Sequence, residues 1–457
     1  MNKKFWDVRK NKSVFFLTPV QLIVFGYFLF VIIGTVLLSL PASLNSGVRL
    51  SPIDALFTAT SAISVTGLTV VSTTDTFSLF GRAILVFLLQ IGGIGIMTLG
   101  TLLYVLVGNQ VNLRNRMMIM ADQNQTSMQG MVYLMLFIFK MAIAFELIGT
   151  VILSAYFWAY YDMPILNALG SGLFHSVSGF TNAGFDLFGN SLWEYSGDYV
   201  IQFIIGVLLM AGAIGFPVLL ELHDYIKARR NARSFRFSLY TKLTTVTFGL
   251  LMLAGFILIL LYEMNGPLSG LPWHQKAAVA LFNSLNTRSG GFSSFDVSAF
   301  GEATLLFFCL LMFIGGSPSS CGGGIRTTTF AVIILSMVSS LKGRSTVRIF
   351  QRELFDSDIA RAFSVFIVAI VLVFTSVILL LGSEPFSTAE IIFEACSAFG
   401  TTGLSMGITD KLSSMGKIII IILMFIGRIG LISLLLLFRK PKKDSGYHFV
   451  KERVIVG

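Results

Sequence analysis

The sequence predicts an all-α, polytopic membrane protein in which four parallel repeats surround a pseudo-four-fold central pore. Each repeat consists of a helix, a pore helix with a filter segment, and a second helix. Three observations predict this fold class. The 457 residues are 55% hydrophobic and only 12% charged, as in membrane proteins. Eight apolar stretches are long enough to cross a bilayer. A short motif containing a glycine near its end returns four times, at residues 57–68, 174–185, 282–292 and 393–404.

The charged residues and the cysteines exclude several other classes of protein. Outside the apolar stretches too little chain remains for a soluble domain. The net charge of +10 does not indicate nucleic acid, because the basic residues gather in short segments that face lipid headgroups. Cys309, Cys321 and Cys396 lie in apolar or glycine-rich segments without paired spacing. They support neither a disulfide framework nor a zinc site.

Eight spanning helices follow from the apolar stretches, since about 20 residues cover a hydrocarbon core of ~30 Å. They are predicted at residues 15–40, 79–107, 131–158, 199–226, 240–264, 303–340, 361–382 and 415–438. Of the 33 lysines and arginines, 24 lie in the termini and after every second helix, so both termini are expected in the cytoplasm. The chain then divides into a cytoplasmic N-terminus (1–14), four repeats (15–110, 111–230, 231–345 and 346–438) and a cytoplasmic tail (439–457).

The four motif copies predict an ion filter. Their glycines are separated by 117, 107 and 112 residues, and the third copy is one residue shorter than the others. Each copy is too short to cross a bilayer and too apolar for an aqueous loop, so it is expected to enter and leave the membrane on one side, where extended backbone must line a water-filled path. Rings of carbonyls can replace the water shell of an alkali cation. The predicted filter carbonyls are those of Val65, Thr66, Gly67, Asn182, Ala183, Gly184, Ser289, Gly290, Gly291, Thr401, Thr402 and Gly403.

The pore helices before the filter segments carry their own start signals. Ser51 with Asp54, and Ser387 with Glu390, have the spacing of capping boxes, and Pro52 suits a first helical position. These helices are expected to begin at the outer surface and to end inside the bilayer. Four helix C-termini, each equivalent to about −0.5 charge, then converge below the filter and favour cations.

Two irregularities interrupt the spanning helices. The sixth contains residues 315–324, a run with three consecutive glycines and a proline that cannot stay helical. The run lacks the Gly-Lys-Ser/Thr ending and the preceding soluble strand of a phosphate-binding loop. In the eighth, Arg428 is the one charged residue within 418–438.

These features together resemble the membrane subunits of the Trk/Ktr/HKT superfamily of potassium transporters, and most closely the Ktr-type B subunits of bacteria. The resemblance covers about residues 19–438. It implies that K⁺ binds at the family's filter glycines, which match Gly67, Gly184, Gly291 and Gly403. Family members also carry an intramembrane loop and a buried arginine beneath the filter. The resemblance therefore implies a gate made of Gly315, Gly316, Ser317, Pro318, Ser319, Ser320, Cys321, Gly322, Gly323, Gly324 and Arg428.

The resemblance also implies a function and partners. The chain is expected to be the ion-conducting subunit of a potassium uptake system in the bacterial plasma membrane, with sodium as an activator in many family members. Such subunits form homodimers and dock on a cytosolic RCK/KTN-type ring that binds ATP or ADP. This chain has no dinucleotide motif after a soluble strand, so the nucleotide is expected on the partner and no cofactor in the chain. The identity of the ring subunit, the ion affinity and the sodium dependence stay open.

Two other function classes find less support in the residues. A secondary transporter of an organic solute would carry inverted repeats and a polar substrate site, whereas these repeats run parallel without paired carboxylates. An enzyme is not expected, because the sequence has no His-rich metal set and no Ser/His/Asp grouping. The roles of the intramembrane charges Lys140, Glu146 and Arg288 stay open.

The depth of Arg428 in the membrane follows from helix geometry. It lies ten residues beyond Ile418, or about 15 Å at ~1.5 Å per residue, which is half of a ~30 Å hydrocarbon core. Gly315 lies twelve residues beyond Ala303, or about 18 Å along the sixth helix. Because the two share a depth, we expect the guanidinium to bind freed carbonyls of the run and to latch it across the ion path. The alternative is an arginine that only assembles neighbouring helices.

Overall fold

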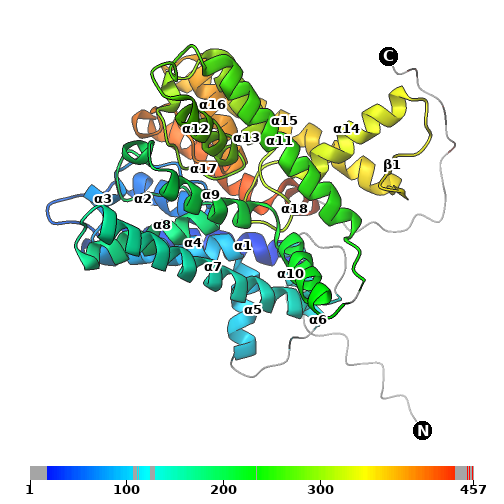
Figure 1. Cartoon of the computed structure of the whole chain (residues 1–457), viewed down its shortest axis with the longest axis horizontal. Coiled ribbons are helices and arrows are strands. Elements are labelled where there is room, and N and C mark those ends of the chain that lie inside the picture. The colour runs from blue at the N-terminus through cyan, green and yellow to red at the C-terminus, as the bar shows by residue number, and fades with distance from the viewer. Residues whose placement is uncertain are drawn as a thin grey trace, which may run out of the picture.

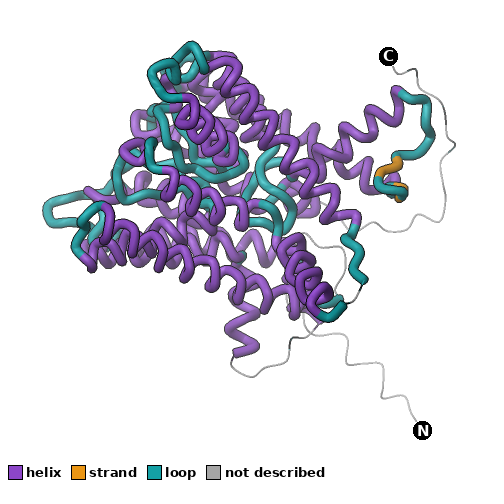
Figure 2. Tube along the Cα trace, in the orientation of Figure 1, coloured by secondary structure: helices purple, strands orange, loops and turns teal. Residues whose placement is uncertain are grey.

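The computed structural model describes residues 18–106, 111, 113–123, 129–232 and 234–437, together with 450, 452 and 455. The predicted N-terminal segment 1–14 and nearly all of the predicted tail 439–457 lie outside these residues. The regular structure of the described chain is almost entirely helical, as the sequence predicts. Figure 1 shows the helices gathered in one bundle, and Figure 2 shows loops that run between helices inside it.

The first helix of each repeat is long, apolar and unbroken, and each could cross a membrane. These helices are α1 (Pro19–Leu38), α7 (Met131–Tyr160), α11 (Leu239–Glu263) and α15 (Asp356–Ser383). The bounds of α7 and α11 agree with the predicted spans within two residues. α15 begins five residues earlier than predicted, because Asp356 and Asp358 add a charged first turn that suits a helix N-terminus.

A shorter pore helix follows in each repeat. These helices are α2 (Pro52–Ser64), α8 (Ile165–Thr181), α12 (Trp273–Asn286) and α16 (Thr388–Gly400). The predicted capping box at Ser387 and Glu390 is present in both directions. The one predicted at Ser51 forms only in part: Ser51 accepts from the Asp54 amide at 3.2 Å, but the Asp54 carboxylate binds the Ser51 hydroxyl and the Lys417 ammonium instead of backbone.

The second helix of each repeat is broken in two, so the continuous spans predicted at 79–107, 199–226 and 415–438 are wrong. The halves are α4 (Leu79–Ile94) and α5 (Ile96–Leu106), α9 (Tyr199–Ala213) and α10 (Phe216–Arg230), α13 (Glu302–Phe313) and α14 (Thr327–Leu341), and α17 (Ser414–Ile429) and α18 (Leu431–Leu437). The α9 and α10 axes meet at 102°. The sequence predicts only the third break, at residues 315–324.

A glycine with a positive φ stands at each break that the sequence did not predict. The φ angles of Gly95, Gly215 and Gly430 are 99°, 102° and 88°, whereas an α-helix needs about −63°. Glycine takes such angles without the steric penalty of a side chain. Each of these glycines follows an isoleucine, and the same pair begins the third break at Gly315. This Ile-Gly pair recurs 24 to 31 residues after each filter glycine, but Ile91-Gly92 and Ile426-Gly427 fall in the same window without a break, so the pair alone does not locate the breaks.

Short elements connect the repeats. They are α3 (Thr73–Thr76), α6 (Leu113–Asp122), four 3₁₀ turns (Pro41–Ser43, Trp193–Tyr195, Val297–Ala299 and Thr409–Lys411) and the strands β1 (Arg348–Ile349) and β2 (Arg352–Glu353). The two strands pair antiparallel as a small hairpin between α14 and α15.

Packing between successive repeats closes a ring. The first half of each second helix lies against the pore helix of the next repeat: α4 against α8, α9 against α12, α13 against α16, and α17 back against α2. Large apolar side chains on the first helices point outward, among them Phe25 and Val36 on α1 and Ile148 and Val151 on α7. Such a surface suits lipid, and it leaves the pore helices enclosed at the centre.

Candidate functional site

The four filter segments share the same pattern of positive φ angles. Two residues before each filter glycine the chain turns left-handed, with φ of 56°, 60°, 80° and 47° at Val65, Asn182, Ser289 and Thr401. The filter glycines have φ of 91°, 67°, 75° and 88° at Gly67, Gly184, Gly291 and Gly403. Left-handed angles at residues other than glycine are uncommon and concentrate at functional sites. Their four-fold recurrence means that the copies share these two backbone angles as well as a sequence motif.

The four filter glycines lie side by side and close a ring. A Cβ on Gly184 would lie 2.5 Å from the Cα of Gly291. A Cβ on Gly403 would lie 3.0 Å from the Cα of Gly67 and 3.1 Å from that of Gly291, and one on Gly67 would collide with the carbonyl of Ala183. Only glycine permits this approach. The structure thus brings all the predicted filter residues to one place.

Hydrogen bonds to the pore helices orient the filter segments. In the first repeat the Thr66 amide donates to the Ser61 carbonyl at 2.9 Å, and the Gly67 amide donates to the Ser61 hydroxyl at 3.1 Å. A trans peptide points its carbonyl opposite to its N–H. The carbonyls of Val65 and Thr66 are therefore directed away from α2, toward the ring. Equivalent amide bonds join Ala183 to Ser178 at 2.8 Å and Thr402 to Ser397 at 2.9 Å.

The third segment reaches the ring with one residue fewer. Its Gly290 amide donates to the Asn286 carbonyl at 2.7 Å, four residues back instead of five. The side-chain oxygen of Asn286 accepts from the Phe292 amide at 3.0 Å. Arg288 is fully buried, and its guanidinium donates to the carbonyl of Leu311 in α13. The shorter copy is thus braced by side chains on both of its flanks.

The two ends of the ring differ. At one end a cavity of about 530 Å³ is lined by residues that include Gly67, Gly403 and the acidic residues Asp296 and Asp410. Carboxylates at a concave entrance raise the local concentration of cations. At the other end the ring is covered by the glycine-rich run.

The glycine-rich run, residues 315–324, lies against the first residues of the filter segments. The Ser289 hydroxyl donates to the Thr401 carbonyl at 2.6 Å and accepts from the Gly323 amide at 3.4 Å. A Cβ on Gly323 would lie 2.5 Å from the Thr401 hydroxyl oxygen, and one on Gly322 would lie 3.0 Å from the Cβ of Ser289. The consecutive glycines therefore let the run approach the filter backbone closely.

Arg428 joins this run to the first repeat. It stands in the last turn of α17, and its guanidinium donates to the Cys321 carbonyl of the run and to the carbonyls of Gly92 and Gly93 at the end of α4, the last at 3.1 Å. Those two carbonyls lack helical partners because α4 ends at Ile94. The contact with the run is the one expected because Arg428 and Gly315 share a depth in the membrane. The contact with α4 depends on a helix break that the sequence did not predict.

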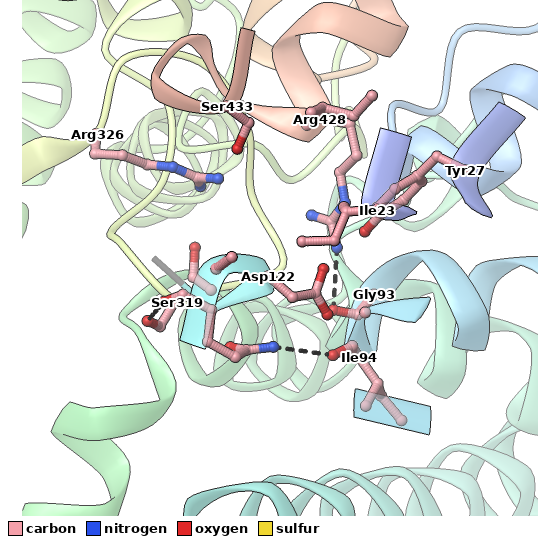
Figure 3. A pocket seen from close by; sticks show the side chains of 14 residues that line it. Ile23, Tyr27, Gly93, Ile94, Asp122, Ser319, Arg326, Arg428 and Ser433 are labelled. Carbon is pink, nitrogen blue, oxygen red and sulfur yellow. Dashed lines mark hydrogen bonds between the residues drawn. The ribbon is translucent and has the colours of Figure 1, made fainter. Parts of the chain in front are cut away.

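Arg326 is a second arginine at the run, which the sequence reading missed. It stands two residues beyond Gly324, the last residue of the run, and its Nη1 donates to the carbonyls of Ser317, at 3.4 Å, and Gly322. Figure 3 shows Arg326 and Arg428 on two sides of a small cavity that Asp122 also lines; its volume is about 20 Å³, room for about one water molecule. The signal that could have found Arg326 is its place beside a break in an otherwise apolar stretch.

The intramembrane charges that the sequence left without a role have different surroundings. Lys140 is exposed on α7, whereas Glu146, on the same helix, is buried and its carboxyl contacts the amide of Gln90 in α4. Arg288 braces the third filter segment, as described above. None of the three lines the ring.

Comparison with known proteins agrees with this geometry. A family profile described as "TrkH: Cation transport protein" matches residues 9–447. The chain is similar to "Ktr system potassium uptake protein D" of Bacillus subtilis (strain 168), with 48% identity over 98% of this chain and 99% of the relative. It is similar to "Ktr system potassium uptake protein B" of the same organism, with 39% identity over 94% of each.

The fold resembles the crystal structure of the potassium transporter TrkH from Vibrio parahaemolyticus, with a TM-score of 0.71, 18% identity, and coverage of 95% of this chain and 86% of that one. At that identity the match concerns the fold alone. The family profile and the 48% identical relative each span nearly the whole chain. The chain therefore belongs to the TrkH family of cation transport proteins.

Proposed function

We propose that this chain is the membrane-spanning, ion-conducting subunit of a potassium uptake system, and that it is not an enzyme. The observation that carries the proposal is the closed ring of four glycine-containing segments whose carbonyls are directed away from the pore helices. Two relatives that match along nearly their full length are named potassium uptake proteins, which supports potassium as the ion.

Conduction follows from the chemistry of the ring. A potassium ion that enters from the 530 Å³ cavity exchanges its water shell for the carbonyl oxygens of residues 65–67, 182–184, 289–291 and 401–403. The C-termini of α2, α8, α12 and α16 end at the ring, and each contributes about −0.5 charge. The ion is thus stabilised without a carboxylate among these twelve residues.

The gate in this proposal is the run 315–324 together with Arg428. The run covers the ring at Ser289 and Thr401, and Arg428 holds it through the Cys321 carbonyl. Its guanidinium also places a positive charge below the filter. Opening requires the run to move aside, which a segment with little intrinsic helicity can do at small energetic cost.

The proposal also covers the assembly. We infer a homodimer in the bacterial plasma membrane with both termini in the cytoplasm, docked on a cytosolic RCK/KTN-type ring that carries the ATP or ADP. The names of the two relatives as parts of a "Ktr system" support the existence of a second component. In this proposal sodium activates potassium uptake and is not a resident cofactor.

Potassium uptake in bacteria that lack their own uptake systems tests the proposal. Cells that express this chain together with a ring subunit should grow at low potassium and should accumulate the ion, with and without added sodium. The chain alone should give less uptake than the pair. If the pair is inserted in the membrane and uptake still equals that of cells with an empty vector, the proposed function is wrong.

A further inference from the structure

The break between α9 and α10 binds the glycine-rich run through the backbone. At the end of α9 the carbonyls of Gly212 and Ala213 have no following helical turn to pair with. They accept from the amides of Cys321 at 3.0 Å and Ser317 at 3.1 Å. The run thus completes the end of the broken helix.

The start of α10 binds the same run from the other side. The amide of Phe216, a helix N-terminal donor without a helical partner, donates to the Ser319 carbonyl at 2.8 Å. The hydroxyl of Tyr240 in α11 donates to the Pro318 carbonyl at 2.6 Å. Gly215 leaves room for both, because a Cβ there would lie 2.8 Å from the Pro318 oxygen and 2.9 Å from the Tyr240 hydroxyl.

The other glycine breaks are completed differently. The carbonyls at the end of α4 are bound by the side chains of Arg428 and Gln123. A Cβ on Gly430, at the fourth break, would meet no heavy atom within 4 Å. Among the breaks at Gly95, Gly215 and Gly430, the one at Gly215 is therefore the one fitted to the backbone of the run.

We propose that the break between α9 and α10 is the seat of the gate: a preformed site that binds the run 315–324 in its closed position, with Tyr240 as a positioning residue. This inference rests on the proposed function, in which the run is the gate. It adds where the closed run is bound and which contacts must break when the gate opens. Because α10 begins at Phe216 and leaves the break at 102°, a displacement of α10 breaks the bond to Ser319 and removes one of the contacts that hold the run closed.

Tyr240→Phe tests the seat because it keeps the ring and removes only the hydroxyl group. It removes the hydrogen bond to Pro318, so the closed run loses stability relative to the open one. Loss of one such bond should raise potassium flux in the absence of the ring subunit roughly two- to ten-fold. The matched control is Tyr262→Phe, on the same helix but 59% exposed, which should leave flux unchanged.

A pair of alanine variants separates the seat from backbone strain. Gly215→Ala and Gly430→Ala place a side chain at similar φ angles, 102° and 88°, but only the Cβ at position 215 meets the run. Gly215→Ala should raise resting flux more than Gly430→Ala. Equal increases in resting flux for the two variants would overturn the proposal that this break is the seat of the gate.

Amide hydrogen exchange gives a readout that does not depend on transport. Tyr240→Phe should speed amide exchange both in peptides that cover 315–324 and in peptides that cover 213–220. Tyr262→Phe should change exchange in neither set of peptides. Faster exchange in the run with unchanged protection of 213–220 would contradict the seat.

Deleting Gly322 and Gly323 tests the gate independently of the seat. If this deletion leaves flux unchanged, the run is not the gate and the proposed gating fails. Raised flux in the deletion variant, with unchanged flux and exchange in Tyr240→Phe, would overturn the seat alone.

Discussion

The ammonium of Lys417 lies 2.7 Å from a carboxylate oxygen of Asp54, although 363 positions of the chain separate the two residues. Lys417 stands in the first turn of α17 and Asp54 in the first turn of α2. Their side chains are only 12% and 19% exposed. The pair therefore ties the fourth repeat to the first pore helix where the ring closes.

Lys417→Met should destabilise the protein because it leaves the Asp54 carboxylate partly buried without its cation. Breaking a buried pair costs about 3–5 kcal/mol and breaking an exposed one below about 1 kcal/mol, so we expect about 2 kcal/mol here. Thermal unfolding in detergent measures the loss. The double variant Lys417→Met/Asp54→Asn should recover most of it, and Lys411→Met, at an exposed position, should cost little. No difference between the Lys417 and Lys411 variants would contradict the role of the pair.

Gly67→Ser should lower the preference for potassium over sodium. Its φ of 91° disfavours a side chain, and the new Cβ would collide with the Ala183 carbonyl in the neighbouring segment. Uptake of the two ions, each measured in competition with the other, gives the preference. Gly47→Ser is the matched control, because it has a similar φ of 84° and no heavy atom within 4 Å of the new Cβ. Undiminished discrimination in Gly67→Ser would remove the first segment from the filter.

Arg428→Gln should raise resting potassium flux and weaken control by the ring subunit. Glutamine keeps some hydrogen bonding but loses the charge, and it cannot reach Cys321, Gly92 and Gly93 at once. Flux with and without the ring subunit is the measurement, and size-exclusion chromatography checks assembly. Poor insertion or a lost dimer would favour the purely structural role. Normal flux with normal regulation would exclude both roles.

Ser387→Ala should destabilise α16 by about 1 kcal/mol through the lost cap, and the loss should depend on pH. The Ser387 hydroxyl and amide hold the pKa of Glu390 below its usual value of 4.5. A lowered folded-state pKa stabilises the protein above the unfolded pKa, and this stabilisation is lost as pH falls through the folded value. The difference in unfolding between parent and variant should therefore be larger at pH 7 than well below pH 4.5, where the bond from the Ser387 hydroxyl to the Glu390 carboxylate is weakened but the bond from the Glu390 amide to that hydroxyl remains. A constant difference across this range would contradict the contribution of the Glu390 carboxylate.

The sequence predicts the long helices and the filter because their signals are repeated. Four glycines at similar spacing point to one ring, even though each taken singly resembles an ordinary helix end. Gly95, Gly215 and Gly430 were missed as breaks because a lone glycine in an apolar helix costs only about 1 kcal/mol, and its effect depends on what binds the freed carbonyls. Those partners, Arg428 at α4 and the run at α9, come from distant repeats, which no local pattern encodes.

Arg428 also has one contact that the sequence predicts and one that it does not. Its depth follows from helix rise alone, and so does its meeting with the run. Its second contact, with Gly92 and Gly93, requires the α4 break and the approach of α17 to the first repeat. Likewise, the missing residue of the third copy is visible in the sequence, but the turn of Ser289 toward Thr401 and Gly323 is not.

The packing of α17 against α2 means that the ring of filter segments closes only through the last part of the chain to be made. The first segment of the ring emerges early, but its neighbour on one side is encoded more than three hundred residues later. Contacts so distant along the chain form late, after the intervening elements have been inserted. Under the proposed function, a nascent chain with three repeats therefore has only three of the four filter segments and an open ring. In that proposal the chain conducts potassium only after the last repeat has docked.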